Sequence, residues 1–133
     1  IDFKNKEILV TGASGGIGRE IVKKFVSLEG KVLATGTNLE RLGLIKKDFP
    51  SIDIINFDIS DHSKIEEFID SASTQLNGLD ILINNAGTNI DNLSLRMKYE
   101  EWKRVIDINL NSTFLISKFA IKKMLKNKYG RIV

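Results

Sequence analysis

The residues Thr11-Gly12-Ala13-Ser14-Gly15-Gly16-Ile17-Gly18 decide the fold of this chain. An apolar run, Ile8-Leu9-Val10, precedes them, and apolar residues at helical spacing follow from position 17 to position 28. A glycine-rich turn between a strand and a helix lets backbone N–H groups approach a phosphate, and the helix N-terminus adds unpaired donors. The turn therefore predicts nucleotide binding, whereas its other interpretation is a plain flexible turn. No Gly-Lys-Ser/Thr closes it, which excludes a phosphate-transfer P-loop.

Outward from this turn, apolar runs rich in β-branched residues alternate with amphipathic helical patterns, as is typical of βαβ units. The predicted strands cover residues 8–10, 32–34, 52–57, 81–83 and 132–133. The predicted helices cover residues 17–28, 38–49, 65–76 and about 100–126. We therefore expect an α/β fold, a doubly wound parallel sheet of the Rossmann type with helices on both faces. Because the ending Arg131-Ile132-Val133 looks like the opening of another strand, residues 1–133 are expected to be the N-terminal portion of a larger single domain, incomplete at the C-terminus.

Composition narrows the class of protein further. The chain has 133 residues, 42% of them hydrophobic and 28% charged, which fits one globular domain. It has no cysteine, so disulfides and thiolate metal sites are excluded, and the single histidine, His62, is predicted to be a solvated residue in a polar stretch. A net charge of +3 is too small to indicate nucleic acid binding. With no signal-peptide pattern and no apolar run near the roughly 20 residues of a membrane span, we expect no membrane partner and a cytoplasmic location.

The spacing Thr-Gly-x-x-x-Gly-x-Gly in residues 11–18 resembles the fingerprint of the short-chain dehydrogenase/reductase family, and three further matches follow in order. Asp58 follows the third predicted strand, where the family's acidic residue meets adenine. Asn84-Asn85-Ala86-Gly87 follows the fourth strand and matches the family's Asn-Asn-Ala-Gly motif. Asn109 lies in the last helix, where the family places its catalytic asparagine. The resemblance covers the whole chain and implies an NAD(P)-binding Rossmann domain of a nicotinamide-dependent oxidoreductase.

The resemblance also implies which residues contact the cofactor. They are Gly12, Ser14, Gly15, Gly16, Ile17, Gly18, Thr37, Asn38, Asp58, Ile59, Asn85, Ala86 and Gly87. The small residues of the Asn-Asn-Ala-Gly turn leave room for a ribose and nicotinamide, and its amides can satisfy backbone groups where the strand ends. Two alternatives remain open: Asp58 can be a simple turn residue, and residues 84–87 can be a plain turn.

Asn109 is unusual for its place in a predicted helix. Asparagine is a poor helix former, costing about 0.6 kcal/mol relative to alanine, and Asn111 follows closely. The functional interpretation is a local helix distortion that frees a carbonyl or side chain for an active-site water relay. The alternative is a polar residue on the solvent face, and the resemblance favours the functional interpretation.

The end of the second strand bears on the choice between NAD and NADP. A carboxylate about 20 residues after the glycine turn would bind the ribose diol of NAD, and none stands there. Thr37 and Asn38 can donate hydrogen bonds, and Arg41 can supply positive charge to a 2′-phosphate. NADP is therefore the expected cofactor, although Gly15 replaces a basic residue common in NADP-using relatives and Glu40 lies nearby.

Within the family, residues 91–98, the triplet Glu100-Glu101-Trp102 and the ending Lys-x-x-Tyr-Gly-Arg-Ile-Val are similar to 3-oxoacyl-[acyl-carrier-protein] reductases of bacterial fatty acid synthesis. This similarity implies NADPH-dependent reduction of 3-oxoacyl-[acyl-carrier-protein], with acyl carrier protein and its acyl substrate as partners, and a homo-tetramer. The alternatives are a reductase of another carbonyl (a sugar, a steroid or a free ketoester) and a non-catalytic nucleotide-binding fragment.

The family's catalytic serine, tyrosine and lysine are expected downstream of Val133. Tyr99 and Lys103 have the Tyr-x-x-x-Lys spacing but precede the asparagine, so they are predicted to be a surface pair. Near the last helix end stands a basic cluster of Lys122, Lys123, Lys126, Lys128 and Arg131, which can steer an acidic partner or simply form a solvated face. That helix is also apolar around much of its circumference, so a second subunit or downstream helices are expected to cover one face.

Overall fold

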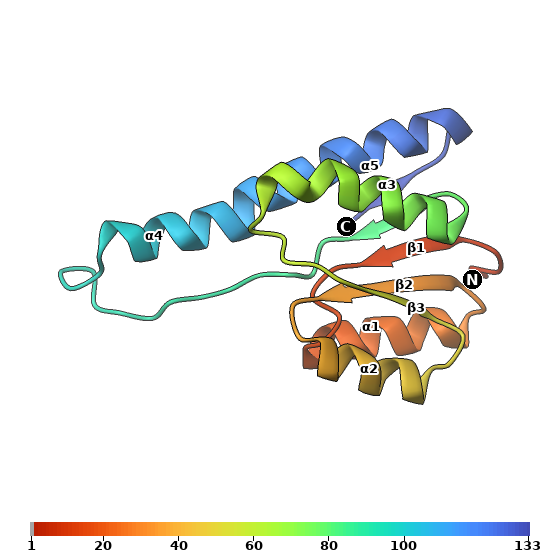
Figure 1. Ribbon diagram of the computed structural model, residues 1–133, viewed down its shortest axis with the longest axis horizontal. Coiled ribbons are helices and arrows are strands. Elements are labelled where there is room, and N and C mark those ends of the chain that lie inside the picture. The colour runs from red at the N-terminus through yellow and green to blue at the C-terminus, as the bar shows by residue number, and fades with distance from the viewer. Residues whose placement is uncertain (1) are drawn as a thin grey trace.

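The computed structural model describes residues 2–133, and five parallel strands within them form one sheet (Figure 1). Ile1, the first residue of the predicted domain, lies outside the described residues. The strands are β1 (Glu7–Val10), β2 (Lys31–Gly36), β3 (Asp53–Asn56), β4 (Ile81–Ile83) and β5 (Arg131–Ile132). Their order is β3-β2-β1-β4-β5, so the chain runs outward from β1 to β3 and returns on the other side of β1. This reversal of direction confirms the doubly wound Rossmann-like fold.

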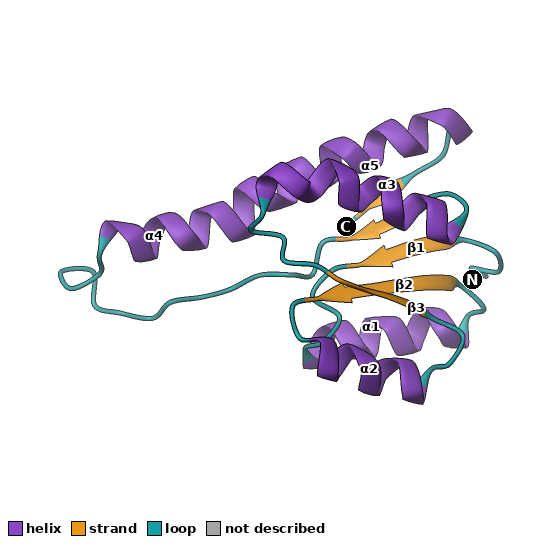
Figure 2. Ribbon diagram, in the orientation of Figure 1, coloured by secondary structure: helices purple, strands orange, loops and turns teal. Residues whose placement is uncertain are grey.

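Helices cover both faces of the sheet (Figure 2). α1 (Gly16–Ser27) and α2 (Leu39–Asp48) lie on one face, and α3 (Ile65–Leu76) and α5 (Thr113–Asn127) lie on the other. Alternate residues of β1 divide between these layers, because successive side chains of a strand point to opposite faces. Ile8 and Val10 are buried with the α1 and α2 side chains, whereas Leu9 is buried with those of α3 and α5.

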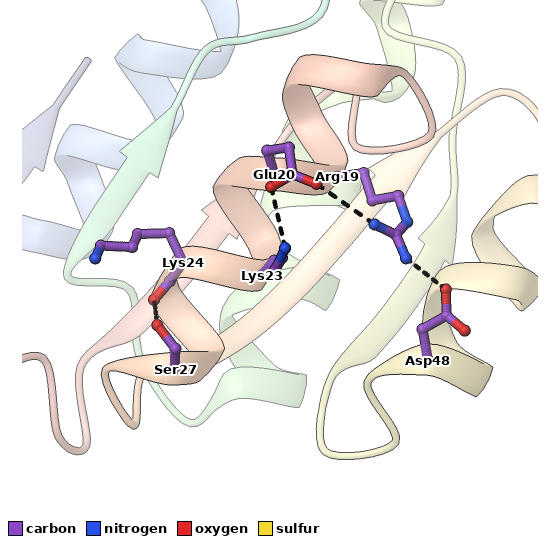
Figure 3. A network of polar contacts seen from close by, with 6 residues as sticks. All are labelled: Arg19, Glu20, Lys23, Lys24, Ser27 and Asp48. Atoms are coloured by element: carbon purple, nitrogen blue, oxygen red, sulfur yellow. Dashed lines mark hydrogen bonds and ion pairs between the residues drawn. The ribbon is translucent and has the colours of Figure 1, made fainter.

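An ion pair joins α1 to α2 on the outside of the first layer (Figure 3). Arg19 Nη2 lies 2.7 Å from Asp48 Oδ2, and Glu20 lies 3.5 Å from both Arg19 and Lys23. These side chains are 40–63% exposed, and such exposed pairs contribute about 0–1 kcal/mol. The two helices are therefore held to the sheet mainly by their buried residues, such as Val22 and Leu42.

The predicted last helix differs from the observed one. In place of one helix over residues 100–126, the chain forms α4 (Tyr99–Ile106), a π-helical turn η2 (Asp107–Ser112) and then α5. A short 3-10 turn, η1 (His62–Lys64), precedes α3. α4 and the loop before it project beyond the sheet (Figure 1), at the end where the strands point. The predicted third strand is also shorter, because only residues 53–56 pair with β2.

Between residues 2 and 133, each helix is too short or too polar to cross a membrane. In the same part of the chain, no group of three or more His, Asp or Glu side chains is arranged to hold a metal ion.

Candidate functional site

A cavity of about 590 Å³ opens at the carboxyl ends of the strands, beside the point where the strand order reverses. It brings together almost every residue predicted to bind the cofactor: Gly12, Ser14, Gly15, Gly16, Ile17, Gly18, Thr37, Asp58, Ile59, Asn85, Ala86 and Gly87. Further lining residues are Thr35, Gly36, Arg41, Phe57, Ser60, Thr88, Arg104 and Ile108. Open parallel sheets bind ligands at this position.

At two positions of the first turn only glycine fits, because other backbone atoms lie too close to leave room for a side chain. Gly12 has φ +62°, and a Cβ there would stand 2.7 Å from Ala86 Cα. A Cβ on Gly18 would collide with the Gly12 carbonyl oxygen and stand 2.7 Å from Ala13 Cα. A Cβ on Gly16, by contrast, meets no protein atom within 4 Å. The space beside Gly16 is thus open, which suits the approach of a ligand to the backbone.

α1 starts at this turn with its first N–H groups directed to the cavity end of the sheet. Its N-cap is Gly15, and no side chain of the described residues caps it by a hydrogen bond. An uncapped helix N-terminus combines unpaired N–H donors with a partial positive charge, and both attract phosphate. The turn therefore has the donors that a diphosphate needs.

The buried hydroxyl of Thr11 ties the glycine turn to the turn after β4. Thr11 Oγ1 donates to Ile83 O and accepts from the backbone N–H groups of Asn85 (3.1 Å) and Ala86 (3.0 Å). Asn85 Nδ2 donates to Gly12 O at 3.1 Å. The Asn85 side chain thus satisfies a backbone group at the strand end, as predicted for the amides of this turn. These hydrogen bonds fix two cavity walls to each other, and the contact of Asn85, Ala86 and Gly87 with a cofactor stays a prediction.

Asn84 acts on the other side of the same turn. Its backbone N–H donates to Val133 O at 2.7 Å, and its Nδ2 donates to Ser117 Oγ at 3.1 Å. Its Oδ1 is buried and has no partner within the described residues. Asn84 thus joins β4 to β5 and α5 and stands behind the cavity wall.

Asn109 lies in the π-helical turn, so the predicted helix distortion is confirmed. Its side chain holds the backbone of Thr88: the Thr88 N–H donates to Oδ1 at 2.8 Å, and Nδ2 donates to the Thr88 carbonyl at 2.8 Å. Its own carbonyl accepts from Thr113 Oγ1 at 2.8 Å. Side chain and carbonyl therefore both have protein partners, contrary to the expectation of a freed group. Asn109 does not line the cavity but supports the loop that does, and its part in a water relay stays a prediction.

Only some of the residues considered for NADP selection at the end of β2 line the cavity. Thr37 and Arg41 line the cavity, whereas Asn38 and Glu40 do not. Asn38 Oδ1 accepts the Arg41 N–H at 2.9 Å and so caps the N-terminus of α2. Asn38 is therefore a helix cap through its Oδ1, and its predicted contact with the cofactor stays a prediction. Arg41 therefore supplies the positive charge that lines the cavity at the end of β2.

Asp58 takes the turn role that was its alternative interpretation. Its Oδ1 accepts the Ser60 N–H at 2.9 Å, yet the residue still lines the cavity. Behind it, the ring of Phe57 stacks on Phe68 with centroids 4.2 Å apart, which gives this wall a rigid support. The contact of Asp58 with adenine stays a prediction.

The prediction that His62 is simply solvated is wrong. The residue is half-buried, and its Nε2 lies 2.9 Å from Ser112 Oγ and 3.2 Å from the Asp107 carbonyl oxygen. The η1 turn places the ring against η2, a contact between residues far apart in the sequence. Polar neighbours in the sequence could not reveal it.

Lys103 and Asp107 form an ion pair at the start of the π-helical turn. Lys103 Nζ lies 2.7 Å from Asp107 Oδ2, and Asn111 Nδ2 donates to Asp107 Oδ1 at 2.8 Å. The hydrogen bond from Lys103, followed by that from Asn111, holds the pKa of Asp107 below its usual value. The same contact raises the pKa of Lys103. Tyr99 is 71% exposed, so the predicted surface location of Tyr99 and Lys103 is confirmed.

Sequence reasoning missed the cavity wall formed by α4 and η2. Arg104 and Ile108 line the cavity one helical turn apart, directly before Asn109. Their i, i+4 spacing ahead of the asparagine is a signal that could have identified them. Arg104 adds a second cation to a cavity that already contains Arg41.

The predicted basic cluster is partly neutralised. Lys122 pairs with Glu66 at 3.1 Å, and Lys123 pairs with Asp70 at 2.6 Å, which lowers the pKa of Asp70. These contacts join α5 to α3. The remaining cations of the cluster are Lys126, Lys128 and Arg131.

Comparisons with known proteins agree with this geometry. Residues 6–133 match the family model described as short chain dehydrogenase. The chain is 43% identical to a 3-oxoacyl-[acyl-carrier-protein] reductase FabG from Rickettsia conorii and 37% identical to one from Escherichia coli. Both alignments cover the whole of this chain but 54% and 55% of those proteins, so the chain spans about half the length of these relatives. A crystal structure of a proposed gluconate dehydrogenase from Agrobacterium tumefaciens superposes with a TM-score of 0.92 at 32% identity, over 98% of this chain and 53% of that one.

Proposed function

Because this chain belongs to the short-chain dehydrogenase family, we propose that it forms the cofactor-binding part of an NADPH-dependent 3-oxoacyl-[acyl-carrier-protein] reductase. The observation that carries the proposal is the meeting of the glycine turn and the Asn-Asn-Ala-Gly turn in one cavity, where Thr11 and Asn85 hold them together. The FabG relatives, identical to this chain at 37–43% over its whole length, supply the substrate class.

The cavity has the features that a dinucleotide needs. The Gly15–Gly16 backbone at the start of α1 would bind the diphosphate. The space beside Gly16 is open to a ligand, and the N–H groups of the helix N-terminus have no side-chain cap among the described residues. Asp58 and Ile59 would flank adenine, and Asn85, Ala86 and Gly87 would flank the nicotinamide ribose. When bound, the cofactor supplies a hydride to the substrate carbonyl carbon.

The protein residues select and orient this cofactor. Arg41 would pair with the 2′-phosphate of NADPH at the end of β2, where no carboxylate lines the cavity to repel it. Asn109 would position the end of this turn, because its side chain forms two hydrogen bonds with the backbone of Thr88, the residue after Gly87. The proton for the new alcohol would come from the family's tyrosine, expected downstream of Val133.

Exposed apolar residues along α4, η2 and α5 support the proposal of a homo-tetramer. They include Trp102, Leu110, Phe114 and Leu125, which are 57–68% exposed. A surface of this kind is normally covered by another subunit or by another part of the same protein. Sedimentation of the intact protein distinguishes these covers, and a monomer at micromolar concentration would contradict the tetramer.

The experiment that tests the function uses the intact protein. Calorimetry with NADPH and NADH measures cofactor binding. Turnover is then compared on 3-oxoacyl-[acyl-carrier-protein] and a free 3-ketoester, each reduced with NADPH, and on gluconate, which is oxidised with NADP+ or NAD+. We expect NADPH to bind more tightly and the carrier-bound substrate to have the highest kcat/KM. Failure to bind either nucleotide would refute the oxidoreductase proposal.

A second candidate function is oxidoreduction of a sugar acid, because the similar crystal structure is that of a proposed gluconate dehydrogenase. Turnover of gluconate with no turnover of the carrier-bound substrate would favour it over the first.

A further inference from the structure

We propose that His62 and Ser112 form a latch that holds the π-helical turn η2 in the register that places Asn109 on Thr88. Both are positioning residues, since neither lines the cavity. The functional consequence rests on the proposed reductase activity, whereas the structural consequence does not.

The latch is a small, closely spaced group of polar atoms. Ser112 is fully buried, and its Oγ lies 2.6 Å from the Ile59 carbonyl oxygen and 2.9 Å from the Asp107 carbonyl oxygen. His62 Nε2 lies 2.9 Å from Ser112 Oγ and 3.2 Å from the same Asp107 oxygen. The group therefore joins three segments: the loop after β3, the η1 turn and η2.

The donors can be assigned from the chemistry of the partners. A carbonyl oxygen only accepts, and a serine hydroxyl has one hydrogen to donate. The shorter contact assigns that hydrogen to Ile59 O. His62 Nε2 must then carry the hydrogen that is shared between Ser112 Oγ and Asp107 O. A glutamine side chain can present an N–H near this position, whereas a leucine cannot.

The π-helical turn needs such support. A π-helical turn is rare, and an α-helical register competes with it. In an α-helix, the Asp107 carbonyl would accept from the N–H of residue 111. Here it accepts from His62 Nε2 and lies 2.9 Å from the Ser112 hydroxyl oxygen. Side-chain donors of this kind stabilise the wider turn at the carbonyl that the α-helical register would use.

Loss of the latch would disturb both sides of the cavity. Moving η2 by one residue toward the α-helical register rotates Asn109 by about 100° around the helix axis. Asn109 would then leave Thr88, and the Ile59 carbonyl would lose the Ser112 hydroxyl. Ile59 and Thr88 line opposite parts of the cavity, after β3 and after β4. We therefore expect loss of the latch to lower turnover, because Asn109 would no longer position Thr88.

The first test measures hydrogen–deuterium exchange of the intact protein, which needs no activity. In His62→Leu, we expect the Thr88 amide and the amides of residues 107–113 to exchange about tenfold faster, as the loss of one hydrogen bond predicts. His62→Gln should stay close to the unaltered protein. Ser63→Ala, an exposed change in the same η1 turn, is the matched control. Ser112→Ala should reproduce the effect of His62→Leu from the other side of the contact.

The second test measures kcat at saturating NADPH and carbonyl substrate. We expect it to fall about tenfold in His62→Leu and to recover in His62→Gln. Unchanged exchange at Thr88 and residues 107–113 in both His62→Leu and Ser112→Ala would overturn the latch. So would equal effects of leucine and glutamine at position 62. If the unaltered protein reduces no carbonyl, the proposed function fails, while the exchange experiment still decides the latch.

Discussion

Thr88 and Asn109 hold each other in both directions, with each residue donating one hydrogen bond of 2.8 Å to the other. Thr88 belongs to the cavity wall after β4, and Asn109 belongs to the π-helical turn behind it. The pair makes the position of the wall depend on the helix register.

Replacing Asn109 tests this dependence. Asn109→Ala removes both hydrogen bonds, about 2 kcal/mol at about 1 kcal/mol each, which corresponds to a roughly thirtyfold loss of kcat/KM. Asn109→Asp keeps an acceptor for the Thr88 N–H but places a carboxylate against the Thr88 carbonyl, so it should not restore activity. Steady-state kinetics on the intact protein measure both. Asn127→Ala, at the exposed end of α5, is the control, and an active Asn109→Ala would contradict the role.

Replacing three glycines by alanine should have three different effects on stability and nucleotide binding. Gly18→Ala forces a Cβ onto the Gly12 carbonyl and should lower Tm and nucleotide affinity together. Gly16→Ala meets open space in the protein and should leave Tm unchanged while weakening nucleotide binding at least about tenfold, because the Cβ occupies the phosphate position. Gly43→Ala, in α2 with no atom within 4 Å of its Cβ, should raise stability by about 1 kcal/mol without affecting binding. Thermal melts and calorimetry separate the three outcomes. Unchanged nucleotide affinity in Gly16→Ala would contradict the phosphate position.

Arg41 should set the preference for NADPH. Arg41→Ala removes the cation nearest the expected 2′-phosphate and should raise the Kd for NADPH about tenfold while leaving that for NADH nearly unchanged. Titration calorimetry with the two nucleotides measures the difference. Lys47→Ala, an exposed change in the last turn of α2, is the control. An equal change in Kd for NADPH and NADH would show that Arg41 does not bind the 2′-phosphate.

Glu7 should make stability depend on pH at the opposite end of the sheet. The Glu7 N–H donates to Asp80 Oδ2 at 3.0 Å, and the Asp80 N–H donates to Glu7 O at 2.9 Å. Burial raises the pKa of Glu7 from 4.5 to about 7, and the hydrogen bond to Asp80 and its charge act in the same direction. A raised pKa means that the folded state holds the proton more tightly than the unfolded state does. This contribution to stability is therefore complete below pH 4.5 and is lost as pH rises through 7.

Glu7→Gln removes the carboxylate that must ionise. We expect its Tm to exceed that of the unaltered protein at pH 8 by about 3 °C and to match it at pH 5. Scanning calorimetry at the two pH values measures the difference. Glu29→Gln, at an exposed position, should show no such difference between the two pH values. An equal effect of Glu7→Gln at both would contradict the ionisation.

The unpaired part of the basic cluster should bind the acidic carrier. Lys126→Glu with Lys128→Glu should raise the KM for carrier-bound substrate about tenfold and leave a small soluble ketone unaffected. Lys24→Glu with Lys47→Glu, on α1 and α2 at the other face of the sheet, makes the same change in net charge and is the control. If carrier-bound and soluble substrates respond alike, the docking surface lies elsewhere.

Most of the strands and the cavity could be predicted because their signals are local. The run Ile8-Leu9-Val10 and the glycines that follow it contain the strand, the turn and the helix start in consecutive residues. The same holds for Asn85, Ala86 and Gly87, which directly follow β4. Even the distortion at Asn109 had a local signal, since asparagine disfavours an α-helix.

The sequence was least informative about side chains whose partners are distant or ambiguous. His62 contacts Ser112 fifty residues away, which no neighbouring residue indicates. Asn38 could serve either a ligand or the helix it precedes: its Oδ1 accepts the Arg41 N–H, and its contact with a cofactor stays a prediction. Arg104 lines the cavity from α4, which projects beyond the carboxyl ends of the strands, and no neighbouring residue indicates that placement.

The pairing of β1 with β4 has a consequence for the order in which the protein can assemble. Residues 8–10 align with residues 81–83, and the Thr11 hydroxyl accepts hydrogen bonds from the backbone of Asn85 and Ala86, which is made more than 70 residues later. During synthesis, the amino-terminal β-α-β-α-β segment leaves the ribosome with one edge of its first strand unpaired. The phosphate turn therefore gains its final shape only after residue 86 has emerged, so a nascent chain shorter than this should not yet retain nucleotide.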